Sequence, residues 1–248
     1  QDHRIRHLGD VGGLNNKQMW EVLSEKRITS GIWGPMNATR GEAALCRFFV
    51  PDPWSFTEDA YPEELTDVLA LPRYAGQNYF NISKLKSGLL VLRFCKPFLL
   101  SKRLRWVALK ELANLLIQFP KHRGQHFTAS LFLDYLAFRG FMEYRKRTEP
   151  DFTLFFFNSI AHLQHQHWNK EKPINENNAW KYGMRYLDRI LGELSREIDN
   201  QEAFVILNGL SQKNTHDEPA WLLYKIIDHQ RFFEKSGLNV ERVEPHMT

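Results

Sequence analysis

The stretch that decides the fold is residues 152–168, Phe152-Thr-Leu-Phe-Phe-Phe-Asn158-Ser-Ile-Ala-His162-Leu-Gln-His165-Gln-His167-Trp168. It opens with an apolar run, residues 152–157, whose aromatic content is typical of a strand buried on both faces. Asn158 or Ser159 can then cap a helix. Open α/β sheets place their sites at the carboxyl ends of strands. The stretch therefore predicts an α/β fold with a site near Asn158.

Apolar runs elsewhere in the chain predict the other strands. Two lie before the decisive stretch, at residues 28–33 and 47–50, and one lies after it, at residues 203–207. Further runs at residues 221–227 and 239–243 predict two more strands. Because helical patterns alternate with these runs at both ends of the chain, we expect an α/β fold with a mostly parallel sheet.

Helical spacing and capping residues predict the helices. Residues 180–198 carry apolar side chains at steps of three and four, which indicates an amphipathic helix. Capping residues and a proline in the first turn predict three shorter helices, at residues 17–26 after Asn16, at residues 62–71, and at residues 229–235 between Asp228 and Gly237.

Residues 72–148 differ from the rest because they are helical by pattern and strongly basic. Residues 84–126 hold ten Lys or Arg and one acid, Glu111, a difference of +9. Pro97 and Pro120 predict breaks that divide the region into three or four helices. We expect a helical, basic insertion that caps the sheet. This divides the chain into an α/β core, residues 1–71 and 149–248, and a cap, residues 72–148.

The basic cap has two open interpretations. It can bind an anionic partner, such as a phosphorylated saccharide or another anionic small molecule, a lipid headgroup or nucleic acid, or it can be a solvated basic face. Residues 89–100 are apolar enough to lie on a membrane surface or to pack on the core. The sequence contains no specific nucleic-acid motif.

Composition excludes several classes of protein. The chain is 43% hydrophobic and 13% aromatic, which is enough for a core and argues against disorder. Two cysteines, Cys46 and Cys95, do not make a disulfide framework in a chain of this length, so a reducing compartment, the cytoplasm, is expected. The sequence has no apolar run of about 18 residues, so no transmembrane segment is predicted.

The polar residues after the central strand suggest a metal site. Asn158, His162 and His165 are spaced i, i+4 and i+7, so they share one face of a helix. They can be metal ligands, or the histidines can bond to backbone while Asn158 caps the helix. His167 points away from that face, which predicts a surface position. Asn208, at the end of another predicted strand, is open to the same two interpretations.

Two loops are candidates for binding an anion or a substrate. Residues 30–37 contain two glycines, and their backbone amides can hold an anion, although the segment has neither a P-loop nor a Gly-x-Gly-x-x-Gly pattern. Asp52, in Pro-Asp-Pro-Trp, can face a substrate, but the geometry of a turn explains it fully.

Six pieces of the chain follow one another in a family-like order: Met19-Trp-Glu-Val-Leu, Ser30-Gly-Ile-Trp-Gly-Pro-Met-Asn37, Phe48-Phe-Val-Pro-Asp-Pro-Trp54, Tyr61-Pro-Glu-Glu-Leu65, Asn158-Ser-Ile-Ala-His162 and Val205-Ile-Leu-Asn-Gly-Leu210. Together they resemble the alkaline phosphatase superfamily, in particular its bacterial type I phosphodiesterase/nucleotide pyrophosphatase-like branch. The resemblance implies an α/β/α sandwich. It also implies hydrolysis or transfer of a phosphate or sulfate ester, with a Thr or Ser nucleophile and two metal ions.

The resemblance also assigns ligand positions. Asn158 stands where the family has a metal-binding Asp, and His162 stands where it has a metal-binding His. Asn208 and Gly209 stand at its Asp-His pair, and His246 matches a third His. His165 is a possible additional ligand. Zinc is the expected ion, with manganese or magnesium as alternatives.

This sequence departs from the family at those positions. Asn in place of Asp removes two carboxylates, which hard divalent cations prefer, and Gly209 offers no ligand. The family's nucleophile is expected upstream of Gln1, so the catalytic residues are unknown and this chain alone is expected to be inactive. We expect the intact form to be a metal-assisted ester hydrolase or transferase. The alternative is a non-catalytic relative that keeps the fold and binds an anionic ligand or a protein partner.

Overall fold

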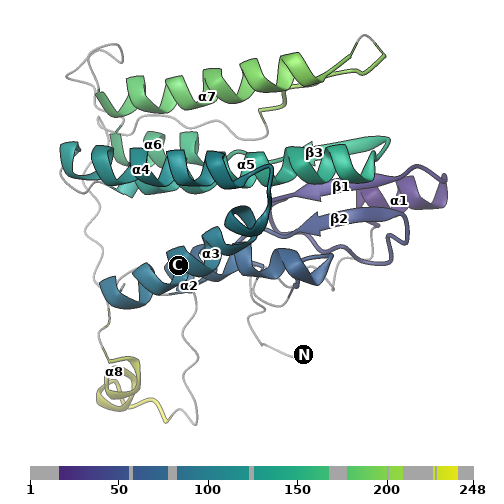
Figure 1. Cartoon of the computed structure of the whole chain (residues 1–248). Helices are drawn as coiled ribbons and strands as arrows, with labels where there is room; N and C mark the ends of the chain where they lie inside the picture. Colours follow the sequence, from purple (N-terminus) through teal and green to yellow (C-terminus); the bar gives the residue numbers. More distant parts are fainter. Residues whose placement is uncertain are drawn as a thin grey trace. The chain divides into compact units, whose positions relative to one another are not determined.

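The computed structural model describes residues 17–55, 58–77, 83–122, 126–167, 178–199, 201–208, 226 and 228–239. The chain divides into two compact units, Gln1–Gln212 and Lys213–Thr248, and each is described by itself. Figure 1 shows the helices and strands of both units. None of the helices in these ranges combines the length and apolar composition that crossing a bilayer requires.

A small parallel sheet is the centre of the larger unit. Its strands are β1 (Ser30–Trp33), β2 (Cys46–Val50) and β3 (Phe152–Phe155), in the order β2-β1-β3. Both pairings are parallel, and β1 pairs with β3 from Ser30 opposite Phe152 to Trp33 opposite Phe155. The α/β fold with a parallel sheet is therefore confirmed, and so are three of its expected strands.

The decisive strand is shorter and more exposed than expected. β3 ends at Phe155, and all four of its residues are half-buried. The expectation of a strand buried on both faces over residues 152–157 is wrong. The fully buried strand is β1, because it lies between the other two and its four residues are all buried.

Helices cover both faces of this sheet. On one face Phe48 contacts Phe141 of α5 (His126–Thr148), with ring centroids 5.9 Å apart. On the other face Phe49 contacts Trp20 of α1 (Met19–Glu25) at 5.6 Å. The alternation of side chains along each strand thus feeds two separate hydrophobic clusters.

The region between β2 and β3 is helical, as expected. It contains a 3-10 helix and four α-helices: η2 (Glu63–Leu69), α2 (Ala70–Gln77), α3 (Lys84–Leu100), α4 (Arg105–Lys121) and α5. The helix expected at residues 62–71 is therefore mostly 3-10. Pro97 and Pro120 lie inside α3 and α4 near their ends and do not break them, because each is within the last turn.

The larger hydrophobic cluster joins these helices to the sheet and to the helices that follow β3. These later helices are α6 (Ser159–His167) and α7 (Asn178–Glu197). Leu131 of α5, Leu163 of α6 and Tyr186 of α7 are buried in this one cluster together with Phe48 of β2. Figure 1 shows α4, α5 and α7 lying lengthwise beside one another. The basic helices are thus part of the main core.

The amphipathic helix expected at residues 180–198 is confirmed as α7, but its buried face differs. Tyr186 and Ile190 are buried, whereas Leu187 and Leu191 are half-buried and Met184 is 37% exposed. The helix is rotated because polar side chains that it carries toward α4 and α5 form a network described below. The spacing of apolar residues in the sequence does not by itself predict such a network.

The strand expected at residues 203–207 is wrong. This segment is irregular, and its apolar side chains are exposed, from 45% for Phe204 to 83% for Leu207. A short apolar run becomes a strand only where a neighbouring strand accepts its backbone hydrogen bonds, and the described sheet offers none here.

Other expected elements fall partly or wholly outside the described residues. Asn16 and nearly all of the strands expected at 221–227 and 239–243 lie there, and α1 begins at Met19. In the smaller unit, α8 (His229–Lys235) is confirmed. Its cap Asp228 accepts a hydrogen bond from the Arg231 N–H at 2.9 Å, and Gly237 follows it with φ of 73°.

Candidate functional site

The carboxyl ends of the three parallel strands meet at one edge of the sheet. Just beyond β1, the Gly34 N–H donates to the Val50 carbonyl at 2.7 Å, and the Phe156 N–H donates to the Trp33 carbonyl at 3.0 Å. Gly34 has φ of 76°, a conformation that favours glycine. The loops that follow β1, β2 and β3 therefore begin at the same edge of the sheet.

Asn158 and His162 lie at this edge, at the start of α6. Their side chains contact each other, with 3.3 Å between Asn158 Nδ2 and His162 Nε2. The expectation that they share a helix face is confirmed. The His162 side chain is half-buried. This burial lowers the pKa of its imidazole, and the neighbouring His165 lowers it further. The imidazole is therefore neutral near pH 7, which is the state that can bind a metal ion or accept a hydrogen bond.

The other two histidines of α6 differ from each other. His165 is exposed. His167 is half-buried: its ring lies 5.1 Å from that of Phe127, and its carbonyl accepts a hydrogen bond from Trp180 Nε1 at 3.2 Å. The expected surface position of His167 is wrong, because α7 supplies Trp180 to this end of α6.

Asp134 of α5 is part of this edge and was missed from the sequence. Its Oδ2 accepts hydrogen bonds from the Asn158 N–H at 3.1 Å, the Ser159 N–H at 2.8 Å and the Ser159 hydroxyl at 2.7 Å. Burial of the carboxyl group raises its pKa to about 6, although these bonds oppose the shift. The available signal was one acid within the apolar helical run Leu131-Phe-Leu-Asp134-Tyr-Leu.

A second internal carboxylate occupies the loops after β1 and β2. Asp52 is buried and accepts hydrogen bonds from the Asn37 N–H, the Trp54 N–H and the Ser55 hydroxyl, each at 2.7 Å. The interpretation of Asp52 as a turn residue is confirmed. Asp52 and Asp134 thus use amide donors that an anionic ligand would otherwise bind.

Of the remaining expected ligands, Asn208 alone is among the described residues. Asn208 is exposed and follows the irregular segment 203–207, so the strand that was to position it does not exist. Gly209 and His246 lie outside the described residues. The metal-binding roles of Asn208 and His246 stay predictions.

The donor atoms at this edge do not fit a two-metal centre. Asn158 and His162 are uncharged ligands, and the Asp134 oxygen nearest them already accepts three hydrogen bonds. Across the described ranges, no group of three or more His, Cys, Asp or Glu residues could hold a metal ion. Two divalent ions about 4 Å apart need carboxylate charge to offset their repulsion, and these residues supply none.

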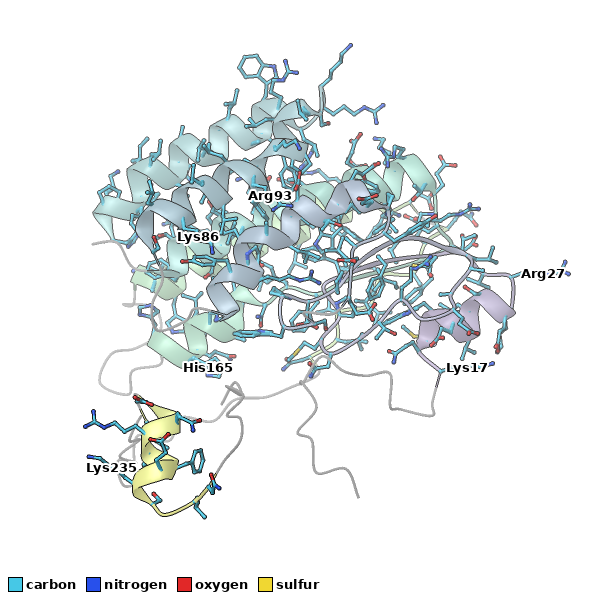
Figure 2. The ribbon with its side chains drawn as sticks, turned by 90° about the horizontal axis from the view of Figure 1, so that it is seen from below. Lys17, Arg27, Lys86, Arg93, His165 and Lys235 are labelled. Atoms are coloured by element: carbon cyan, nitrogen blue, oxygen red, sulfur yellow. The ribbon has the colours of Figure 1, made fainter. Side chains whose placement is uncertain are left out.

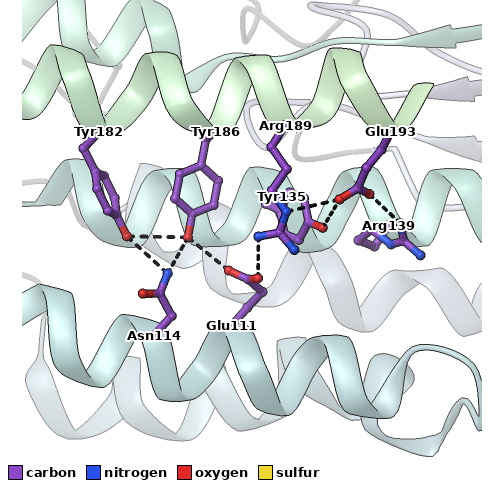
Figure 3. A network of polar contacts seen from close by, with 8 residues as sticks. All are labelled: Glu111, Asn114, Tyr135, Arg139, Tyr182, Tyr186, Arg189 and Glu193. Atoms are coloured by element: carbon purple, nitrogen blue, oxygen red, sulfur yellow. Dashed lines mark hydrogen bonds and ion pairs between the residues drawn. The ribbon is translucent and has the colours of Figure 1, made fainter. Parts of the chain in front are cut away.

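A separate polar network connects α4, α5 and α7 (Figure 3). Glu111 is 1% exposed and accepts hydrogen bonds from Arg189 Nη1 at 2.6 Å and from the Tyr186 hydroxyl at 3.1 Å. Glu193 accepts hydrogen bonds from the Tyr135 hydroxyl at 2.6 Å and from Arg189 Nε at 3.1 Å, and it also pairs with Arg139. Because the carboxylates are matched by guanidinium groups, the network holds α7 in place and needs no ligand.

Neither a protein-family model nor a curated protein nor a solved structure matches this chain. A functional assignment therefore depends on the sequence resemblance and on the geometry at the edge of the sheet.

Proposed function

We propose that this chain carries part of a phosphate- or sulfate-ester site of the alkaline phosphatase type, at the carboxyl end of β3. The observation that carries the proposal is the contact between Asn158 and His162 at 3.3 Å. These two residues stand where the resembling family has an Asp and a His that bind metal, and they lie at the sheet edge where such folds place their sites.

In this site His162 and Asn158 contribute neutral ligands to a single divalent ion. An imidazole-led set suits zinc better than magnesium or manganese, which prefer carboxylate oxygens. When bound, such an ion supplies positive charge for the non-bridging oxygens of an ester. His162 is suited to this role because burial keeps its imidazole neutral.

A second candidate is a non-catalytic relative that keeps the fold and binds an anionic small molecule, such as a phosphorylated saccharide. One observation favours it: the carboxylate of Asp52 accepts hydrogen bonds from its own loop, and that of Asp134 accepts them from the start of α6, which leaves no charged ligand for a catalytic metal centre.

Zinc titration of the chain by calorimetry tests the proposal. We expect one weak site, lost in His162→Ala and retained in Gln164→Ala, a control on the same helix to which no metal role is given. Aryl phosphate and aryl sulfate esters are then offered with zinc present. Turnover that His162→Ala abolishes shows a working hydrolase site in this chain. Zinc binding without turnover is the result expected if the chain holds only part of the site, and absence of zinc binding overturns the metal-binding role of His162.

A further inference from the structure

The outward face of α4 is apolar along its whole length. Trp106 is 75% exposed, Leu109 41%, Leu116 68% and Ile117 55%. These residues recur at helical spacing, so they form one stripe on the side of α4 that faces away from the core. A solvated helix carries polar residues on that side.

The inward face of α4 combines apolar and polar side chains: Ala108, Leu112 and Leu115 pack in or against the core. Glu111 and Asn114 point toward α7, where Asn114 Nδ2 donates to the Tyr186 hydroxyl at 2.9 Å and Glu111 pairs with Arg189. The helix therefore carries apolar side chains on both its inward and its outward face. The exposed leucines and Trp106 of α4 are not part of the core, because other side chains of α4 already fill its core-facing side.

A second exposed apolar stripe runs along α3, the neighbouring helix. Its residues Leu85, Leu89, Leu92 and Leu100 are 79%, 61%, 61% and 68% exposed, again at helical spacing. Leu100 and Trp106 lie on either side of the short turn that joins the two helices. We call these eight residues the α3–α4 surface: Leu85, Leu89, Leu92, Leu100, Trp106, Leu109, Leu116 and Ile117.

The exposed charged side chains described within residues 83–122 are all positive. Within residues 83–122 the one acid, Glu111, is buried, whereas the described basic side chains are exposed at Lys86, Arg93, Lys96, Lys102, Arg103, Arg105, Lys110 and Lys121. Figure 2 shows Lys86 and Arg93 on α3. Asp67 pairs with Arg93 and Lys96, and Glu143 pairs with Arg103, so two negative charges offset two of the eight positive ones. The surface keeps a net positive charge.

We propose that the α3–α4 surface binds the surface of an anionic phospholipid membrane. Leucine and tryptophan on one face with Lys and Arg beside them is the composition of helices that lie in the membrane interface. The apolar side chains enter the headgroup region, and the cations attract anionic lipids. Nucleic acid fits less well, because a leucine stripe offers nothing to phosphate. This inference is independent of the ester site.

Vesicle co-sedimentation of the full chain tests the proposal. We expect binding to phosphatidylcholine vesicles that contain phosphatidylserine, little binding to phosphatidylcholine alone, and weakening by salt. Lys110→Gln should lower the partition coefficient about fivefold, and Trp106→Ser should lower it about tenfold or more. Lys181→Gln and Leu207→Ser are matched controls, since both residues are exposed on other segments, and they should leave binding unchanged.

Tryptophan fluorescence gives a second, independent measurement. Lipids brominated in the acyl chain should quench the wild-type chain, and Trp106→Phe, which keeps the apolar contact, should bind equally but lose most of the quenching. The proposal is overturned if anionic vesicles are not bound, or if Trp106→Ser and Leu207→Ser weaken binding equally. It is also overturned if Trp106→Ser dissociates an oligomer and vesicles are not bound, or if a nucleic-acid duplex binds more tightly than vesicles.

Discussion

Two of the regions that hold a buried carboxyl group partner it differently. Between α4, α5 and α7, Glu111 and Glu193 contact the guanidinium groups of Arg189 and Arg139. Between α5 and α6, the carboxyl of Asp134 contacts only neutral donors, the amides of Asn158 and Ser159 and the Ser159 hydroxyl. The carboxylates of the first region are paired with cations, whereas the carboxyl group of Asp134 is not.

The difference shows what decides the ionisation of a buried acid. Burial acts to raise the pKa of Glu193, but hydrogen bonds from Tyr135 and Arg139 outweigh it, so the pKa is lowered. For Asp134 burial wins over three neutral hydrogen bonds, and its pKa rises to about 6. Neutral donors stabilise a carboxylate less than a guanidinium does, so of these two regions it is the α5–α6 region that is sensitive to mildly acidic pH.

The largest loss of unfolding free energy should come from removing the cation that pairs with Glu111. Arg189→Ala leaves Glu111 buried without its cation, and we expect a loss of about 3 kcal/mol of unfolding free energy, at the low end for a buried pair because Arg189 is 36% exposed. Denaturant unfolding measures it. Arg196→Ala, on an exposed turn of the same helix, is the control, and a similar loss in both variants would contradict the role given to the network.

The buried carboxyl group of Asp134, between α5 and α6, should make the unfolding free energy depend on pH. The pKa of Asp134 in the folded chain lies above its ordinary value of 3.8, so between about pH 4 and 6 the folded state holds more protons than the unfolded state. The unfolding free energy from this group therefore falls as pH rises through that window, by about 2 kcal/mol. Comparing wild type with Asp134→Asn at several pH values isolates the term, and a pH-independent difference would show that Asp134 does not titrate there.

A third test separates charge from packing in the attachment of α7. Its Gly183 packs on α6, where an added Cβ would lie 2.1 Å from Leu163 Cδ1, whereas a Cβ at Gly192 meets nothing within 4 Å. We expect Gly183→Ala to destabilise by about 1 to 2 kcal/mol, because Leu163 is fully buried and must shift. Gly192→Ala should instead stabilise by about 0.5 to 1 kcal/mol. Thermal or denaturant unfolding gives both signs, and equal effects would refute the close α6–α7 packing.

The smallest effect should come from a charge pair in water. Lys146 and Glu197 lie 3.7 Å apart with side chains 65% and 50% exposed. Lys146→Ala should change the unfolding free energy by less than about 0.5 kcal/mol and less still in high salt. If the loss approached that of Arg189→Ala, burial would not be what separates the two kinds of pair.

The sequence by itself determined the elements whose signals are local. Apolar runs located β1 and β2, a step of three and four residues located α7, and Asp228 with Gly237 bounded α8. The i, i+4 spacing also determined that Asn158 and His162 share a helix face. These features depend on hydrogen bonds and periodicities that span a few residues, so a short window of sequence contains them.

Only the tertiary structure decided which of these signals were used. Residues 203–207 have the composition of a strand but no neighbour to pair with, so they stay irregular and exposed. Asp134 reaches the α6 terminus from 24 residues away, and Arg189 reaches Glu111 from 78 residues away. Such pairings depend on how whole helices pack, since a buried acid needs a donor whose position no local window contains. The same packing placed Glu111 and Asn114 of α4 toward α7 and left Trp106, Leu109 and Leu116 of that helix exposed.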